Sequence, residues 1–224
     1  MLRWLRKEAK ISYSQCGEDL IVDFLLQTMR IHKPTYLDIG AHHPTYISNT
    51  FLFYEKGCSG VCIEPDPTLM QRIKKVRKDD ICLNVGVGVG EAEKAKFYLL
   101  TSRTLNTFSL EEATRYQTYG GQKIEEVIDV PLVPINKVIS EYFSPCPNFV
   151  SLDVEGMDYE VIKTFDFEKY KPEVFCIETL TYTEDKTEKK IVEIIDYMKS
   201  RDYLAFADTY INTIFVNRSA WNRR

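Results

Sequence analysis

The 224-residue sequence lacks the marks of several large protein classes. No apolar run approaches the roughly 20 residues that a membrane-spanning helix needs. The basic N-terminus has neither the apolar stretch nor the cleavage site of a signal peptide. No long run of Lys or Arg occurs and the net charge is −4, so electrostatics gives no reason to expect nucleic acid as a partner. We therefore expect a cytoplasmic protein without a transmembrane segment.

The sequence is also poor in residues that bind zinc. It has three histidines, and its six cysteines form no C-x-x-C pair. Cys62, Cys82 and Cys176 fall in apolar runs typical of strands, where a thiol behaves as a small buried hydrophobic group. Reduced, buried thiols are therefore expected.

What the chain does have is an alternation of short apolar runs with amphipathic stretches, which indicates parallel βαβ units. Its length predicts one α/β domain over 1–224, beginning with a helical segment over 1–30. Two late strands, 203–207 and 212–217, are expected to run antiparallel. The other expected strands are 36–40, 60–65, 81–88, 94–100, 125–133, 148–156 and 173–179, and the expected helices are 46–56, 67–77 with a basic outer face, one near Pro134, 158–165 and 185–200.

Residues 101–124 lack clear periodicity, contain Thr and Ser, and include the pair Gly120-Gly121. An irregular connection of that length in a compact domain is more often functional than not. We therefore expect a mobile segment that acts as a lid over a substrate.

Three strand ends carry residues suited to a nucleoside. Asp38 and Gly40 end the first strand, and a glycine there permits a tight turn or a close approach to a ligand. Glu64 ends the second strand, where a carboxylate can accept hydrogen bonds from both hydroxyls of a ribose. The glycines of NVGVG (84–88) leave room for an adenine at the third. A solvated charge and plain turns are the alternatives, and the absence of G-x-G-x-x-G disfavours NAD.

Four stretches together resemble the FkbM family of S-adenosylmethionine-dependent methyltransferases. They are SQCGED (14–19), YLDIGAHHPTYISNTFLFYEKGCSGVCIEPDP (36–67), NVGVG (84–88) and SLDVEGMDYEVIKTFDF (151–167). The resemblance implies a Rossmann-like class I methyltransferase fold, with a mostly parallel seven-stranded sheet, helices on both faces and an antiparallel final strand. It also implies O-methylation of a sugar, nucleotide sugar or glycan. A polyketide or other small-molecule acceptor, and a non-catalytic nucleoside-binding module of this fold, are the alternatives.

The strand ends and the resemblance together name candidate contacts for S-adenosylmethionine. Asn49, at the start of the second helix, is suited to the methionine carboxylate. Asp66 is suited to the ribose or adenine edge, or to capping the next helix. Gln15 and Glu18 contact the cofactor or cap the first helix. The full candidate set is Gln15, Glu18, Asp38, Gly40, Asn49, Glu64, Pro65, Asp66, Val85 and Asp153.

Methylation of an alcohol calls for a base or a metal, because a hydroxyl is a weak nucleophile. The candidate bases are Asp153 and Glu155, after the fourth core strand, and His43, after the first. Asp153 and Glu178 are candidate ligands for Mg²⁺, which prefers carboxylates. A helix cap for Asp153 and a turn-bound role for His43 are the alternatives. A small-molecule or glycan acceptor is expected as partner, and a homodimer is left open beside a monomer.

Overall fold

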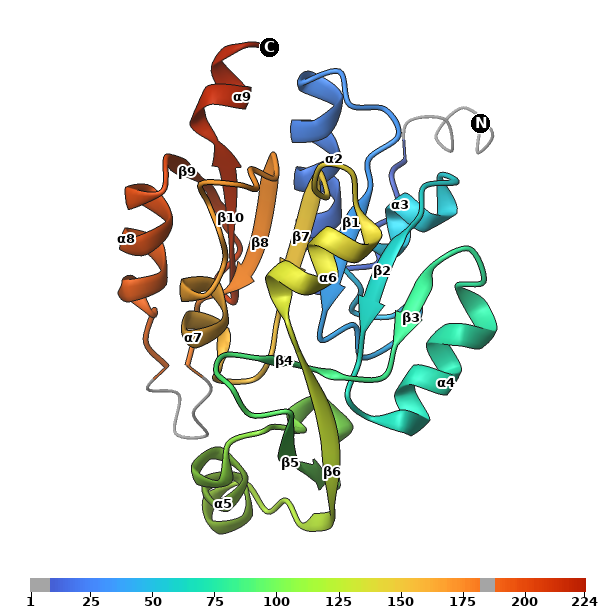
Figure 1. The fold of residues 1–224 in the computed structure, drawn as a ribbon, viewed down its shortest axis with the longest axis vertical. Helices are drawn as coiled ribbons and strands as arrows, with labels where there is room; N and C mark the ends of the chain where they lie inside the picture. Colours follow the sequence, from blue (N-terminus) through green and yellow to red (C-terminus); the bar gives the residue numbers. More distant parts are fainter. Residues whose placement is uncertain (1–8, 182–187) are drawn as a thin grey trace.

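The computed structural model describes residues 9–181 and 188–224, whose strands form two sheets (Figure 1). The strands of the larger sheet are β1 (Tyr36–Ile39), β2 (Gly60–Ile63), β3 (Ile81–Leu83), β7 (Phe149–Leu152), β8 (Val174–Glu178), β9 (Tyr203–Asp208) and β10 (Asn212–Asn217). Their order is β3-β2-β1-β7-β8-β10-β9. All pairs are parallel except those of β10, which runs antiparallel to both of its neighbours. The predicted seven-stranded, mostly parallel sheet with an antiparallel final strand is confirmed.

Helices cover both faces of this sheet. Successive strand residues point to opposite sides, so each buried strand packs against helices on both faces. The helices are α2 (Glu18–Thr28), α3 (Phe51–Glu55), α4 (Pro67–Val76), α6 (Ile135–Tyr142), α7 (Asp158–Lys163), α8 (Val192–Ser200) and α9 (Arg218–Asn222). On one face, Leu37 and Val150 belong to a core shared with α6, α7 and α8. On the other face, Tyr36 and Phe149 pack with α2 and α3, and Cys62 packs with α4. Because helices bury both faces of the sheet, the parallel strands are continuous apolar runs.

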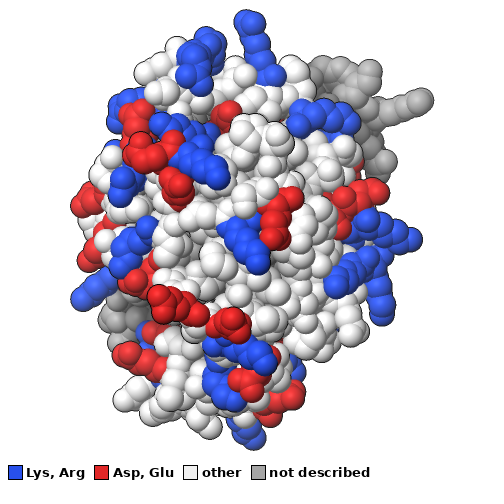
Figure 2. All heavy atoms as spheres, in the orientation of Figure 1, with Lys and Arg blue, Asp and Glu red and all other residues white. Residues whose placement is uncertain are grey.

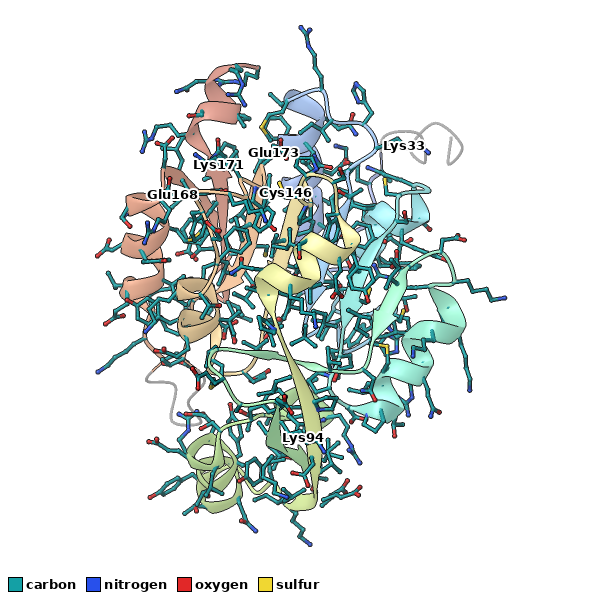
Figure 3. The ribbon with its side chains drawn as sticks, in the orientation of Figure 1. Lys33, Lys94, Cys146, Glu168, Lys171 and Glu173 are labelled. Atoms are coloured by element: carbon teal, nitrogen blue, oxygen red, sulfur yellow. The ribbon has the colours of Figure 1, made fainter. Side chains whose placement is uncertain are left out.

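A smaller sheet lies beyond the carboxyl ends of the parallel strands (Figure 1). In it β4 (Gly86–Gly88) pairs parallel with β6 (Ile124–Pro134), and β5 (Lys94–Leu100) pairs antiparallel with β6. The predicted strand 81–88 is therefore two strands, one in each sheet. In Figure 3, Lys94 at the start of β5 lies at this end of the molecule, and Glu173, directly before β8, lies at the opposite end.

The connection 101–124 is more regular than its sequence indicates. It contains a 3₁₀ turn, η1 (Arg103–Leu105), and the helix α5 (Leu110–Tyr119). Ser109 caps α5, because its Oγ accepts a hydrogen bond of 3.2 Å from the N–H of Glu112. Only Ala113 and Tyr116 of the helix are buried, which is too few to give a visible period. The prediction of an irregular connection was wrong, whereas the lid role stays a prediction.

The N-terminal helical segment is shorter than predicted. Residues 1–8 lie outside the described residues, 9–17 are not helical, and α2 begins at Glu18. Asp19 accounts for this start, because its carboxylate accepts hydrogen bonds from the Ser12 hydroxyl (2.6 Å) and the Tyr13 N–H (2.7 Å). Such side-chain bonds hold a turn in competition with a helix. The predicted helix 185–200 is likewise described only as α8, since 182–187 lie outside the described residues.

The described part of the chain contains no helix of the length and apolarity needed to cross a bilayer. On the face seen in Figure 2, Lys and Arg side chains are interspersed with Asp and Glu.

Candidate active site

A cavity of about 440 Å³ lies where the main sheet faces the smaller one. Its walls come from the loops after β1, β2, β7 and β8, from residues 103–108, and from the turn between β9 and β10. The chain runs outward from β1 to β2 and β3, then crosses back to β7 on the other side of β1. Such a reversal of strand order opens a crevice at the carboxyl ends of the strands, which is the usual ligand site of an open α/β sheet.

Gly40 forms the turn at the carboxyl end of β1 and lines the cavity. Its φ of +82° lies in the left-handed region that favours glycine. A Cβ at this position would lie 1.7 Å from the carbonyl oxygen of Asp153. The close approach of the ends of β1 and β7 therefore requires glycine before any ligand is considered.

Glu64 lies at the carboxyl end of β2 with its carboxylate on the cavity wall. One oxygen accepts the N–H of His42 and the other the N–H of Asp66, each at 2.8 Å. Each carboxylate oxygen keeps further capacity to accept a hydrogen bond. Burial raises the pKa of Glu64 to about 7, against the effect of these two backbone N–H groups. Glu64 therefore fixes two loops and still presents two acceptors to the cavity.

A second, apolar hollow of about 200 Å³ adjoins the first and shares Gly40, Pro65 and Phe108 with it. Its other walls include Ile63 and Leu132 from the two sheets. A flat, weakly polar ring fits such surroundings, and Glu64 lies directly before Pro65 at the junction of the two hollows.

Asp153, Glu155 and Glu178 also line the larger cavity, from the ends of β7 and β8. Burial, with the negative charge of Asp38 adding to it, raises the pKa of Asp153 to about 6. Burial and the neighbouring carboxylates raise the pKa of both Glu155 and Glu178 well above the usual range. The three predicted acids thus do meet at one wall, where each makes ionisation of the others less favourable.

Glu155 has a backbone φ of +51°, unusual for a residue with a side chain. Two residues of the 101–124 connection hold it there. The Thr107 hydroxyl donates to the carbonyl oxygen of Glu155 at 3.0 Å, and the Tyr116 hydroxyl of α5 hydrogen-bonds to its carboxylate. The connection therefore packs directly on the predicted catalytic loop.

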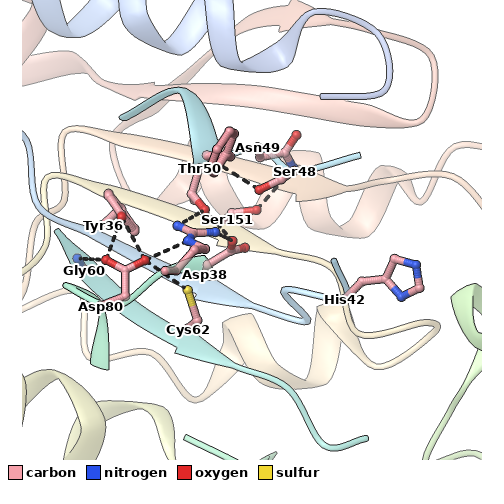
Figure 4. A network of polar contacts seen from close by, with 12 residues as sticks. Tyr36, Asp38, His42, Ser48, Asn49, Thr50, Gly60, Cys62, Asp80 and Ser151 are labelled. Atoms are coloured by element: carbon pink, nitrogen blue, oxygen red, sulfur yellow. Dashed lines mark hydrogen bonds and ion pairs between the residues drawn. The ribbon is translucent and has the colours of Figure 1, made fainter. Parts of the chain in front are cut away.

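Asp38 has its carboxylate within the protein rather than on the cavity wall (Figure 4). The Thr50 hydroxyl donates to it at 2.5 Å, and the fully buried Arg77 lies 3.5 Å from it. Arg77 also donates to Asp80 at 2.7 Å and to Thr50 at 2.8 Å. Arg77 directly follows α4 and is buried, whereas Arg72, Lys74 and Lys75 form the exposed basic face that the sequence predicts. A cofactor contact of Asp38 stays a prediction.

Other predicted contacts have partners inside the protein. Glu18 accepts hydrogen bonds from Thr209 (2.7 Å) and Asn212 (3.2 Å), and so fastens α2 to the turn between β9 and β10. Burial would raise the pKa of Glu18, but these bonds and the N–H of Cys16 lower it. The amide of Asn49 donates to the Ser151 hydroxyl of β7 at 3.2 Å.

Asp66, Val85 and His43 also make contacts with residues close to them in the structure. Asp66 caps α4, as one of its two interpretations predicted. Val85 packs against the apolar core. Nδ1 of His43 accepts a hydrogen bond of 2.9 Å from the N–H of Tyr46. The histidine that lines the cavity is its neighbour, His42. Of the predicted residues, Gln15, Gly40, Glu64, Pro65, Asp153, Glu155 and Glu178 line the cavity, whereas Glu18, Asp38, Asn49, Asp66, Val85 and His43 do not.

No group of three or more His, Cys, Asp or Glu side chains in 9–181 and 188–224 is arranged to hold a metal ion. Binding of Mg²⁺ by Asp153 and Glu178 stays a prediction.

A family model described as the methyltransferase FkbM domain matches residues 38–205. The match includes the ends of β1, β2, β7 and β8, which form the cavity. The chain belongs to the FkbM methyltransferase family. It is thus a methyltransferase, and membership of this family implies S-adenosylmethionine as the methyl donor. A search of curated proteins finds no match to this FkbM methyltransferase.

Solved structures similar to this FkbM methyltransferase are also methyltransferases by description. A precorrin-6y C5,15-methyltransferase from Geobacter metallireducens is 12% identical, with a TM-score of 0.40 over 88% of this chain and 86% of the other. A protein described as a candidate methylase from Haemophilus influenzae is 13% identical, with a TM-score of 0.45 over 91% and 89%. One described as a candidate caffeoyl-CoA O-methyltransferase from Staphylococcus aureus is 10% identical, with a TM-score of 0.45 over 96% and 90%.

Sequence reasoning missed several residues that line the cavity of this FkbM methyltransferase. Arg103 and Asn106 reach it from the 101–124 connection, and Ile211 from the turn directly before β10. The polar pair had a usable signal, since both residues lie in the connection that the sequence already marked as functional. In the structure Asn106 is a buried amide that donates to Asp66 at 3.1 Å. Ile211 had none, because only the placement of β10 beside β8 brings it to the cavity.

Proposed function

We propose that this methyltransferase is an O-methyltransferase that acts on a hydroxyl of a sugar, nucleotide sugar or glycan. The observation that carries the proposal is the meeting of Gly40, Glu64 and Asp153 around one cavity at the reversal of strand order. The three residues supply what the reaction requires: a close backbone approach, a ribose acceptor and a base.

The residues fit S-adenosylmethionine part by part. The two carboxylate oxygens of Glu64 accept the ribose hydroxyls, since each still has capacity for a hydrogen bond. The apolar hollow beside Pro65 takes the adenine. The acidic wall formed by Asp153 and Glu178 favours the positive charge of the sulfonium.

When bound, the cofactor supplies a methyl group whose bond to sulfur breaks, with the electron pair left on sulfur, as the acceptor oxygen bonds to carbon. Asp153 accepts the proton of the acceptor hydroxyl, because a pKa of about 6 leaves it ionised yet basic near neutral pH. Glu155 and Glu178 hold their protons more readily than ordinary glutamates, since their pKa values lie well above the usual range, so Asp153 is the group that we assign to accept the proton.

Two measurements test the proposal. Isothermal titration with S-adenosylmethionine tests binding, and release of S-adenosylhomocysteine with a panel of sugars, nucleotide sugars and polyketide alcohols tests transfer. We expect both binding and transfer to a sugar hydroxyl. Binding without transfer to any hydroxyl would favour the non-catalytic module instead, and transfer only to polyketide alcohols would favour the alternative acceptor.

A further inference from the structure

Tyr210, in the turn between β9 and β10, has an unusual backbone conformation for its residue type. Its φ is +75°, in the left-handed region that glycine and asparagine favour and that strains an aromatic residue. Short hairpin turns commonly place one residue in this region, and glycine is the usual choice there. The chain thus has a large side chain at a position where a smaller residue would fold with less strain.

Hydrogen bonds on both sides hold the turn in this conformation. The Thr209 hydroxyl donates to Glu18 of α2 at 2.7 Å. The carbonyl oxygen of Ile211 accepts a hydrogen bond of 2.9 Å from the N–H of Thr179, directly after β8. A strained residue persists only where its surroundings hold it, and such residues gather at functional sites. The conformation of Tyr210 therefore calls for an explanation in its side chain.

Packing within the protein does not explain the choice of a tyrosine. Tyr210 is 62% exposed, yet it is one of the residues that line the cavity. Its neighbour Ile211 and the nearby Leu180 line the cavity too, so the wall at this end is partly apolar. An exposed tyrosine at the rim of a substrate cavity suits ligand binding, because it offers a large contact area and loses little conformational freedom.

The order of the strands places Tyr210 on the acceptor side of the proposed base. Glu64 ends β2, and Asp153 follows β7, which lies two positions further along the sheet. β10 lies two positions beyond β7 in the same direction (Figure 1). Two strand spacings are roughly 10 Å, within the reach of an acceptor of one or two sugar rings. Because the ribose is assigned to Glu64, the side of Tyr210 is left for the acceptor.

Resting on the proposed O-methylation of a sugar, we propose that Tyr210 is the platform on which a pyranose ring of the acceptor stacks, and that it determines specificity for cyclic sugars. The face of an aromatic ring is negative. One face of a pyranose presents apolar, weakly positive C–H groups, so the two faces attract each other. The fixed backbone holds Tyr210 at the rim before the acceptor arrives, which reduces the entropy lost on binding. Tyr210 binds the acceptor and takes no part in proton transfer.

The test compares the cyclic and open-chain forms of the same sugars. With the enzyme saturated in S-adenosylhomocysteine, methyl glucoside, methyl galactoside and methyl mannoside are each titrated by ligand-observed NMR. Sorbitol, galactitol and mannitol are the matching open-chain alcohols. We expect at least one glycoside to bind about tenfold more tightly than its open-chain alcohol, as for a well-placed aromatic contact.

Three variants separate the ring of Tyr210 from the turn that carries it. Tyr210→Asn removes the ring but suits the left-handed backbone, so stability should be equal or higher while glycoside affinity falls about tenfold. Tyr210→Phe keeps the ring and should bind the glycoside as the wild type does. Tyr142→Asn changes a tyrosine at the end of α6 that does not line the cavity, and it should also bind as the wild type does.

Equal affinity for every glycoside and its open-chain alcohol, no binding of any glycoside, or unchanged glycoside affinity in Tyr210→Asn would each overturn the inference. A loss in Tyr210→Phe as large as in Tyr210→Asn would also overturn it, because the hydroxyl and not the ring would then be the contact. If S-adenosylhomocysteine binds and one of these results is found, the inference alone fails. If S-adenosylhomocysteine does not bind to the wild-type enzyme, the proposed function fails and the inference falls with it.

Discussion

At the scale of single residues, Glu64 holds two loops together and is the ribose contact that we propose. Glu64→Gln should weaken the binding of S-adenosylmethionine by about 1.5–3 kcal/mol, the range for hydrogen bonds to a charged group. The amide also places an NH₂ group against one of the two backbone N–H donors that Glu64 now accepts. Isothermal titration measures the effect, with Glu168→Gln as the control. An unchanged affinity in a folded variant would remove Glu64 from the cofactor site.

The raised pKa of Glu64 also predicts a pH dependence of stability. Because its pKa is about 7 in the folded chain and 4.5 for an unperturbed glutamate, the folded chain binds more protons between these values. Its contribution to stability is therefore most favourable at low pH and is lost as pH rises from about 4.5 to 7, by up to about 3 kcal/mol.

Chemical unfolding of the cofactor-free protein at pH 5 and pH 8 measures this contribution as the difference between wild type and Glu64→Gln. We expect the variant to gain stability relative to wild type as pH rises. A difference between the two proteins that stays constant with pH would contradict the raised pKa.

Asp153 is the residue on which turnover should depend. Asp153→Asn keeps the size of the side chain and removes its charge, so we expect kcat to fall by about 100-fold, as for loss of a positioned base, with little change in cofactor affinity. Asp196→Asn, exposed on α8, is the matched control. A near wild-type rate would exclude Asp153 both as base and as metal ligand. If activity depends on Asp153, treatment with EDTA distinguishes its two roles. Activity that is lost with EDTA and restored by Mg²⁺ would indicate a metal ligand, whereas activity that EDTA does not change would indicate a direct base.

At the scale of elements, the connection 101–124 is the segment most suited to respond to substrates. It is fastened to the loop after β2 by Asn106 and Arg103, which donate to Asp66, and to the loop after β7 by Thr107, which donates to Glu155. We expect protection of its amides from hydrogen exchange to rise when cofactor and acceptor are both bound. Exchange in α6, which contributes no residue to the cavity wall, is the internal control. No rise in 101–124 would reject the lid.

The sequence predicted elements well where their pattern is local. The strands 36–40, 60–65 and 173–179 match β1, β2 and β8 within two residues at each end, because buried parallel strands are short apolar runs. Long-range partners were not predictable. Arg77 follows a helix with basic residues, and only the fold reveals that Asp38, from β1, lies beside it. The same holds for Glu18, whose partner Asn212 is 194 residues away.

At the scale of the whole molecule, the homodimer stays a prediction. Sedimentation equilibrium distinguishes the 26.1 kDa mass of one chain from its double. Because β9 forms one edge of the main sheet, a dimer through this edge should be disrupted by Ala205→Pro, since proline removes a backbone N–H donor.

The insertion of β10 between β8 and β9 has a consequence for synthesis on the ribosome. The ribosome makes β8, then β9, and then β10. In the sheet, however, β10 lies between β8 and β9, so neither strand can pair on that side before β10 is made. Until β10 emerges, β8 has an unpaired edge and the site at its carboxyl end lacks Ile211. Asn212, the partner of Glu18, is then missing as well. A nascent chain stalled before residue 212 should therefore remain sensitive to protease, and completion of the last strand should confer both resistance and the ability to bind the cofactor.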